Sequence, residues 1–167
     1  MNIAEIDSRL AVQGEIKEPE LVWADARRPP FRIYGLHDVR NQPVFRRIPE
    51  AVAQAVSPGV AALHTNTAGG RVRFQTDSPY IAIRAEMPAA CLMPHMALAG
   101  SAGFDLYRYE GRECRYAATF MPSADKARGY ESLIYAGAGG MREYLINFPL
   151  YSDVTNLHIG LHRGFRV

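Results

Sequence analysis

Apolar and polar side chains alternate along most of the chain after Gly70. In residues 71–76, Val72, Phe74 and Thr76 fall on one side, and the arginines and glutamine between them fall on the other. Successive side chains of a strand point to opposite faces, so a period of two predicts strands that bury one face. The same alternation predicts further strands in residues 80–87, 104–109, 114–120, 130–135, 141–148 and 156–162.

Turn residues between these segments predict how the strands connect. Glu110-Gly111 closes a predicted hairpin between residues 104–109 and 114–120, and Gly137–Gly140 closes a second one within residues 130–148. Glycine suits both places because tight hairpin turns require a positive φ. Two shorter strands are predicted nearer the N-terminus, at Leu21–Trp23 and Phe31–Tyr34.

Helical character is confined to residues 46–70. Pro49 can open a helical turn there and Pro58-Gly59 interrupts it, so we expect one or two short helical turns. Many short strands with so little helix favour an all-β fold. Two antiparallel sheets that bury their apolar faces on each other, a β-sandwich, satisfy the pattern.

Length, composition and charge narrow the class of protein. The 167 residues, 48% of them hydrophobic and 22% charged, fit one globular domain, which we expect at residues 21–167 after a loosely attached polar segment 1–20. A net charge of +2 does not favour nucleic acid as a partner, and no apolar run is long enough to span a membrane. Cys91 and Cys114 form no disulfide framework and no signal peptide is evident, so the expected location is cytoplasmic.

Ser101 is the candidate nucleophile. It lies at the centre of Ala99–Gly103, which fits a loosened nucleophile-elbow pattern. Such an elbow needs a strand before the serine and a helix after it, whereas Ser101 precedes a predicted strand. A small-residue turn is therefore favoured, and a small hydrolase that uses Ser101 with His95 is the alternative.

Neither the glycines nor the histidines predict a cofactor. A phosphate-binding loop needs a helix directly after it, but a strand follows Gly137–Gly140. His158 and His162 share one face of a strand without an evident third ligand for zinc. We expect no metal and no cofactor, and two half-exposed histidines on the outer face.

Asp105 stands at the head of the first predicted hairpin. Phe104 and Leu106 point to the core on the alternation, so Asp105 and Tyr107 point to the other face. No acid or base lies in register with Asp105. We therefore expect it to fix the adjoining loop rather than to take part in catalysis.

Residues 87–103 should form a surface loop between two strands, although many of their side chains are apolar. A contiguous exposed apolar patch marks a contact surface, and flexible methionines suit one. The loop folding back to cap one end of the sandwich is the alternative, and the sequence leaves both open. The apolar side chains are Met87, Cys91, Leu92, Met93, Met96 and Leu98.

Five stretches, in this order, resemble the N-terminal domain of SGNH-hydrolase-type, or GDSL-like, esterases: FRIYGL, FRRIP, HTNTAGGRVRFQTDS, HMALAGSAGFDLY and NFPLYSDVTNLHIGL. The resemblance covers residues 21–167 and includes the Gly-x-Asp-Leu-Tyr signature at Gly103, Asp105 and Tyr107. It implies a jelly-roll-like β-sandwich placed before an α/β/α hydrolase domain that carries the catalytic triad. No position in this sequence matches the catalytic motifs, so the resemblance implies no catalytic residue here.

The resemblance also implies a role and a partner. The role is that of an accessory domain that packs on a C-terminal hydrolase domain of the same protein and helps to shape its substrate cleft, for a small ester or an acylated carbohydrate. The residues expected at the cleft are Met93, His95, Met96 and Ser101. The signature residues Gly103, Asp105 and Tyr107 are expected to be structural.

A free-standing carbohydrate-binding module is the alternative from another class. Sugar-binding sandwiches display aromatic side chains as platforms for sugar rings. The candidate platforms are Trp23, Tyr80, Tyr107, Tyr109, Tyr135 and Tyr144.

Overall fold

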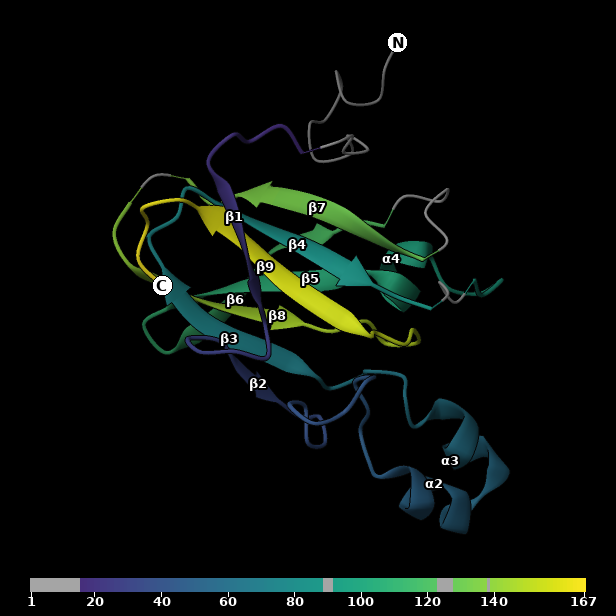
Figure 1. The fold of residues 1–167 in the computed structure, drawn as a ribbon. Coiled ribbons are helices and arrows are strands. Elements are labelled where there is room, and N and C mark those ends of the chain that lie inside the picture. The colour runs from purple at the N-terminus through teal and green to yellow at the C-terminus, as the bar shows by residue number, and fades with distance from the viewer. Residues whose placement is uncertain (1–15, 89–91, 123–127, 138) are drawn as a thin grey trace.

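The computed structural model describes residues 16–88, 92–122, 128–137 and 139–167. Among these residues, nine strands form two stacked antiparallel sheets, which confirms the predicted β-sandwich (Figure 1). One sheet has four strands in the order β1-β9-β4-β7, and the other has five in the order β2-β3-β8-β5-β6. The strands are β1 (Leu21–Asp25), β2 (Arg32–Tyr34), β3 (Arg71–Thr76), β4 (Tyr80–Glu86), β5 (Phe104–Glu110), β6 (Glu113–Phe120), β7 (Gly129–Tyr135), β8 (Arg142–Asn147) and β9 (Asn156–His162).

The described residues contain three short helices, α2 (Glu50–Val56), α3 (Pro58–Leu63) and α4 (Leu98–Ala102). The first two confirm the predicted short helical turns on either side of Ser57, whose side-chain oxygen accepts a hydrogen bond from the Val60 amide at the start of α3. The sequence pattern does not predict α4, because the small residues there suit a turn equally well. No helix in the described part of the chain has the length and apolar character needed to cross a membrane.

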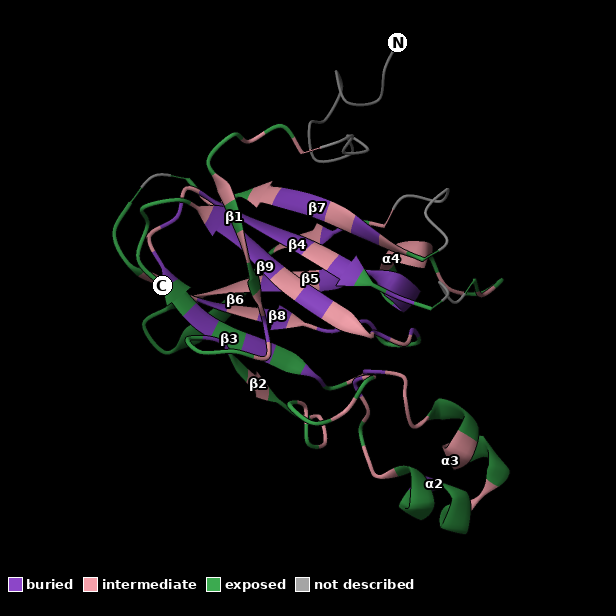
Figure 2. Cartoon of the chain, viewed as in Figure 1, coloured by how far each residue is buried: buried purple, intermediate pink, exposed green. Residues whose placement is uncertain are grey.

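The two sheets enclose a single main core. In β3 the side chains of Val72, Phe74 and Thr76 are buried and those between them are exposed, which confirms the predicted alternation and appears as bands along β3 in Figure 2. From β9, Leu157 and Ile159 enter the same core with Leu161. Burial of one face of each sheet is what holds the sandwich together.

The strand β4 departs from one-sided alternation, because Tyr80 and Ala82 on its outer face are buried too. Trp23 and Leu21 from β1 cover them, and Gly160 makes the room, since a Cβ there would lie 2.8 Å from both of these side chains. The second cluster consists of Tyr80, Ala82 and Leu133, with Ile16, Leu21 and Trp23 packed against it.

Both ends of the described chain lie against the four-stranded sheet or its turns. The Tyr135 hydroxyl donates to Glu18 Oε1 over 2.6 Å, so residues 16–20 contact the sandwich. Near the C-terminus, the Thr76 hydroxyl donates to the Arg166 carbonyl and the Arg166 amide donates to Asp77. The C-terminal residues therefore lie at the opposite end of the sandwich from α4 (Figure 1). Residues 1–15 and Cys91 lie outside the described residues.

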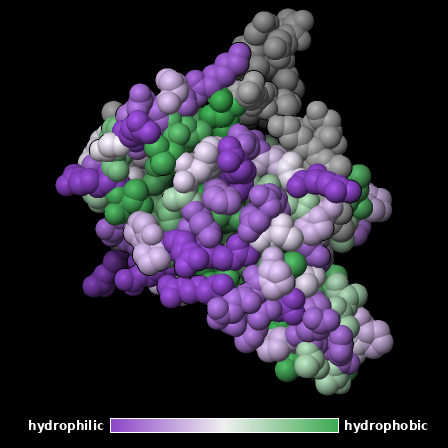
Figure 3. Space-filling view, in the orientation of Figure 1, coloured by the Kyte–Doolittle hydropathy of each residue, from purple (hydrophilic) through white to green (hydrophobic). Residues whose placement is uncertain are grey.

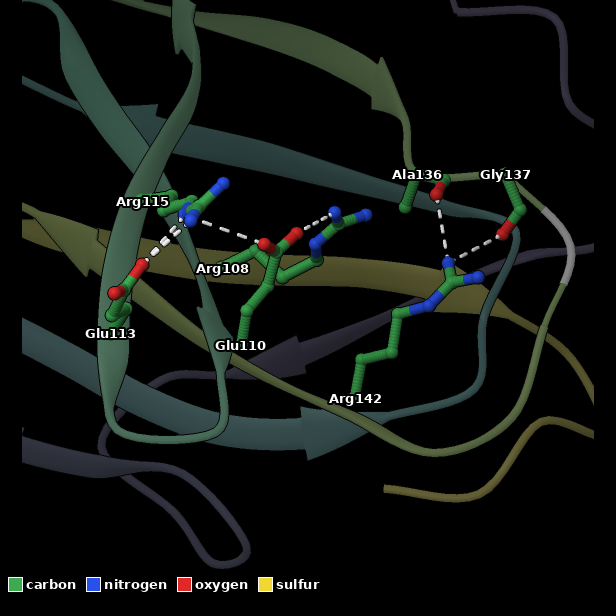
Figure 4. A network of polar contacts seen from close by, with 7 residues as sticks. All are labelled: Arg108, Glu110, Glu113, Arg115, Ala136, Gly137 and Arg142. Atoms are coloured by element: carbon green, nitrogen blue, oxygen red, sulfur yellow. Dashed lines mark hydrogen bonds and ion pairs between the residues drawn. The ribbon is translucent and has the colours of Figure 1, made fainter.

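The first predicted hairpin is confirmed, with its turn one residue later than expected. Glu110 pairs with Glu113, and Gly111, at φ 65°, forms the two-residue turn with Arg112. Beside the turn, the Glu110 carboxylate pairs with Arg108 and Arg115, and Arg115 also reaches Glu113 (Figure 4).

The second predicted hairpin is wrong. β7 pairs with β4 in one sheet, whereas β8 lies between β3 and β5 in the other. β7 and β8 therefore belong to different sheets, and the Arg142 side chain at the start of β8 donates to the carbonyls of Ala136 and Gly137 after β7 (Figure 4). Stacked sheets are about 10 Å apart, a distance that six residues span easily. A glycine-rich link of this length fits either connection, so the sequence pattern does not distinguish them.

Replacement of Phe104 by alanine should test the core. Phe104 is fully buried against Tyr130 and Phe148, so we expect Phe104→Ala to lower the free energy of unfolding by about 3–5 kcal/mol. Denaturant titration followed by circular dichroism measures this loss. Tyr116→Ala, at an exposed position of the neighbouring strand, is the control and should cost about 1 kcal/mol or less. Equal losses in the two variants would contradict the assigned core.

Candidate functional site

A row of polar side chains crosses the outer face of the five-stranded sheet at one end of the sandwich. Strand pairing aligns Arg71 of β3 with Asn147 of β8, Asn147 with Asp105 of β5, and Asp105 with Thr119 of β6. Residues paired across neighbouring strands point to the same face. Four strands therefore bring together a guanidinium group, an amide, a carboxylate and a hydroxyl.

The row forms one wall of a groove of about 330 Å³. The segment before β3, the helix α4 and the residues after β8 enclose the remainder. This volume lies within the range of small-ligand pockets, roughly 300–1,000 Å³. The lining residues are Gly69, Gly70, Arg71, Ala99, Gly100, Gly103, Asp105, Thr119, Asn147, Phe148 and Leu150.

Asp105 is held by a chain of side-chain hydrogen bonds. The Thr119 hydroxyl donates to Asp105 Oδ1 over 2.7 Å, and the Tyr116 hydroxyl lies 2.8 Å from the Thr119 oxygen. Because the single Thr119 proton is used toward Asp105, Tyr116 must donate in its turn. Only one carboxylate oxygen is used in this chain. The prediction that Asp105 faces outward is confirmed, and its observed partner is a side-chain hydroxyl of the neighbouring strand.

Arg71 and Asn147 have unused hydrogen-bonding capacity. Among the described residues, neither side chain has a hydrogen-bond or ion-pair partner. Arg73, two residues along β3, contrasts with this because it is paired with Glu143. The groove thus offers free donors from Arg71, a donor and an acceptor from Asn147, and an acceptor from Asp105. Such a mixed set can recognise hydroxyl, carbonyl or carboxylate groups.

Gly103 permits the junction between α4 and β5. Its amide donates to the Ala99 carbonyl over 2.9 Å, and a Cβ at this position would lie only 2.2 Å from that same oxygen. No side chain fits there without moving the backbone. The signature glycine thereby determines where the helix ends and where Asp105 enters the groove wall.

The buried hydroxyl groups of Tyr130 and Ser152 hydrogen-bond to backbone carbonyls of α4. The Tyr130 hydroxyl lies 3.0 Å from the Ala102 carbonyl and 2.9 Å from the Phe120 carbonyl, so it joins the end of α4 to the end of β6. Burial raises the pKa of Tyr130 well above its ordinary value, which keeps the hydroxyl protonated as a donor. Ser101 is buried as well, and its carbonyl accepts from the Ser152 hydroxyl and the Tyr151 amide.

The remaining residues expected at the cleft lie on the segment that leads into α4. His95 is exposed, and Met93 and Met96 are half-buried and joined by a β-bridge. Met96 lies beside Gly100 in the groove wall. Met87 is buried in the core, whereas Leu92 is 78% exposed, so one part of this loop caps the sandwich and another faces outward. The buried Ser101 hydroxyl, 3.4 Å from the Leu98 carbonyl, is not presented as an exposed nucleophile.

The aromatic candidates are divided among three places. Tyr144 is buried in the main core, and Trp23, Tyr80 and Tyr135 belong to the four-stranded sheet. On β5, Tyr107 packs edge-to-face against Tyr116, and the Arg73 guanidinium lies over the ring of Tyr109.

The two histidines of β9 are half-buried, as the pattern predicts, and His162 packs between Tyr80 and Phe165. Within the described residues, no three His, Cys, Asp or Glu side chains are grouped to hold a metal ion.

Sequence reasoning did not assign Arg71, Asn147 or Thr119 to a site. Each occupies an outward position near a strand end, which alternation can indicate, but their association depends on the strand order β3-β8-β5-β6. Those strands come from separate parts of the chain, so spacing along the sequence carries no signal of the row.

The fold and the groove define a β-sandwich domain with its signature glycine and aspartate at a ligand-sized groove. The family model named GxDLY, the N-terminus of SGNH-hydrolase-type esterases, matches residues 21–167, and the chain belongs to this family. The comparison with curated proteins gave no match.

Two solved structures share the fold. A protein from Bacteroides ovatus assigned as a GDSL-like lipase has a TM-score of 0.76 and 24% identity over 87% of this chain. The salicylyl-acyltransferase SsfX3 from a tetracycline biosynthetic pathway has a TM-score of 0.62 and 20% identity over 90% of this chain. In both cases the match covers 42% of the other protein, so this chain spans less than half of their length.

The signature glycine provides a test of the α4–β5 junction. We expect Gly103→Ala to lower the free energy of unfolding by about 1–3 kcal/mol, because the added methyl group overlaps the Ala99 carbonyl. Gly100→Ala is the matched control, since its Cβ would meet only the flexible Met96 side chain, and it should stay within about 0.5 kcal/mol of wild type. Thermal and denaturant unfolding of both variants measure the difference, and a neutral Gly103→Ala would refute the close approach.

Proposed function

We propose that this chain is the non-catalytic N-terminal domain of an SGNH-hydrolase-type esterase, and that its groove forms one wall of the substrate cleft. The catalytic groups belong to the C-terminal hydrolase domain. The observation that carries this proposal is the position of Gly103 and Asp105 in an open groove where Arg71 and Asn147 have unused hydrogen-bonding capacity. A polar wall with free donors and acceptors suits substrate recognition better than packing alone.

An acylated carbohydrate suits the two kinds of surface in the groove. Sugar hydroxyls both donate and accept, so they match the Asp105 carboxylate and the Asn147 amide together. Phe148, Leu150 and Ala99 supply an apolar wall for an acyl chain or for the apolar face of a sugar ring. In this role the chain orients the substrate, and the ester bond lies toward the hydrolase domain. Met93, His95 and Met96 would then lie at the rim, and Ser101 would support the loop at residues 151–152.

Steady-state kinetics of the full-length esterase test the groove. We expect Asn147→Ala to raise KM for an acetylated sugar about tenfold, the effect of one or two lost hydrogen bonds, with kcat little changed. Hydrolysis of p-nitrophenyl acetate, which has no sugar hydroxyls, should be unaffected.

Arg112→Ala is the control for the same kinetics, because Arg112 lies in the β5–β6 turn, away from the groove. It should leave KM for both esters at the wild-type value. Identical kinetics for Asn147→Ala and Arg112→Ala on the acetylated sugar would refute the proposed role of the groove.

A free-standing carbohydrate-binding module is the second candidate. The observation in its favour is that Tyr107 of β5 and Tyr116 of β6 are cross-strand partners beside the Asp105 row. A sugar ring could stack there on an aromatic face. Titration calorimetry of the chain with oligosaccharides tests it. Binding by this chain alone that Tyr107→Ala abolishes and Asn147→Ala leaves unchanged would favour the module over the cleft wall.

A further inference from the structure

Residues 49–64 form an arm that projects from the sandwich (Figure 1). Its helices α2 and α3 contain one charged residue, Glu50, and most of their outward side chains are apolar. Val52, Val56 and Leu63 are 50%, 63% and 45% exposed. Green and pale atoms accordingly mix with purple ones over this part of the surface in Figure 3.

The arm does not bury these side chains against its own domain. Of the residues in α2 and α3, only Ala53 is buried. Helices of seven and six residues are marginal by themselves in water, and helices in proteins are stabilised chiefly by packing of an apolar face. The exposed face of the arm therefore has the character of a contact surface.

Hydrogen bonds fix the base of the arm to the sandwich. The Arg47 amide donates to the His64 carbonyl over 2.9 Å, and the Arg47 guanidinium donates to the Leu63 carbonyl over 2.6 Å. These two bonds join the start of the arm to its end. The Thr67 hydroxyl lies 3.2 Å from the carbonyls of Pro149 and Ser152, and Asn66 donates to Asp153. These contacts tie the residues directly after the arm to the loop that follows β8, which also lines the groove.

A hollow of about 250 Å³ lies at the base of α3. Engineered apolar cavities of about 150 Å³ bind benzene, so this hollow can take an aliphatic or aromatic side chain. His64 Nδ1 lies 2.7 Å from the Ala61 carbonyl and donates to it, which leaves Nε2 as an acceptor in the neutral ring. Nε2 is buried and has no partner among the described residues. The lining residues are Arg47, Ile48, Gly59, Val60, Leu63 and His64.

We infer that the arm is a docking element for the C-terminal hydrolase domain of the same protein, which inserts an apolar side chain into this hollow. The inference rests on the proposed function. The groove and the arm lie at the same end of the sandwich, because only residues 65–68 separate the arm from Gly69 and Gly70 of the groove wall. A domain that covers the groove comes within reach of the arm.

Other exposed apolar side chains extend the surface from the arm past the groove. Leu150 and Tyr151 lie in the loop to which the arm is tied, and Leu92 lies on the segment leading to α4. A second copy of this chain is the other possible occupant of the arm, and the experiment distinguishes it.

Hydrogen–deuterium exchange of the full-length esterase tests the inference. We expect the amides of residues 50–63 to be protected in the wild-type protein. The charged variants Val56→Asp and Leu63→Asp should raise their exchange rates about tenfold or more, together with those of one segment of the hydrolase domain. Met141→Asp is the matched control, because Met141 is 42% exposed in the link that leads into β8, away from the arm.

The outcomes separate this inference from the proposed function. An arm that exchanges at unprotected rates in the wild-type protein overturns docking, even where Asn147→Ala still raises KM. A protected arm together with a wild-type KM for Asn147→Ala supports docking and contradicts the proposed role of the groove in the substrate cleft. A wild-type dimer by light scattering that Val56→Asp converts to monomer assigns the arm to a second copy and also overturns the inference.

Discussion

Each of the two sheets has one face of apolar side chains, and neither face is stable in water unless the other covers it. Phe104, Ile146 and Ile159 come from both sheets and are fully buried between them. Because this mutual burial uses the inner faces completely, only the outer faces, the strand ends and the connections remain for contacts with other molecules. The groove and the arm both lie in that remainder, at one end of the sandwich.

The groove depends on the sandwich through a few short-range constraints. Gly103 allows α4 to end against β5, and the Tyr130 hydroxyl joins α4 to the end of β6 from within the core. The core thus determines where the helix lies, and the helix determines the shape of the groove. Asp105 is held in place by its buried neighbours Phe104 and Leu106 and by the hydrogen bond from Thr119. In the proposed role, a side chain held in this way would bind a ligand without a large loss of conformational entropy.

Much of this fold follows from local physical chemistry. The period of two in β3 and β9 predicts which side chains enter the core, and the structure confirms them. The hairpin at Gly111 is predictable because a glycine between two alternating segments favours a tight turn, and the two strands do pair across a two-residue turn. The connection between β7 and β8 is not, because two alternating strands and a glycine-rich link describe an in-sheet hairpin and a crossing between sheets equally well.

The groove shows a similar division between local and distant information. The outward direction of Asp105 follows from its position between two core residues, and the signature marks the strand as unusual. Arg71 and Asn147 become part of the site only through strand order, a property of the whole fold. The burial of Tyr80 and Ala82 on the outer face of β4 likewise depends on a distant segment, β1, and on the absence of a side chain at Gly160.

The strand β9 runs away from the groove, so that residues 163–167 lie beside the β3–β4 turn, about 20 Å from the Asp105 row when measured along a six-residue strand. In the proposed arrangement, a hydrolase domain linked through these residues would be tethered at one end of the sandwich and aligned at the other. The tether sets only the effective concentration of that domain, which changes slowly with linker length. In that arrangement, alignment would come from the groove and the arm. Linker length and cleft geometry can therefore diverge independently among related enzymes.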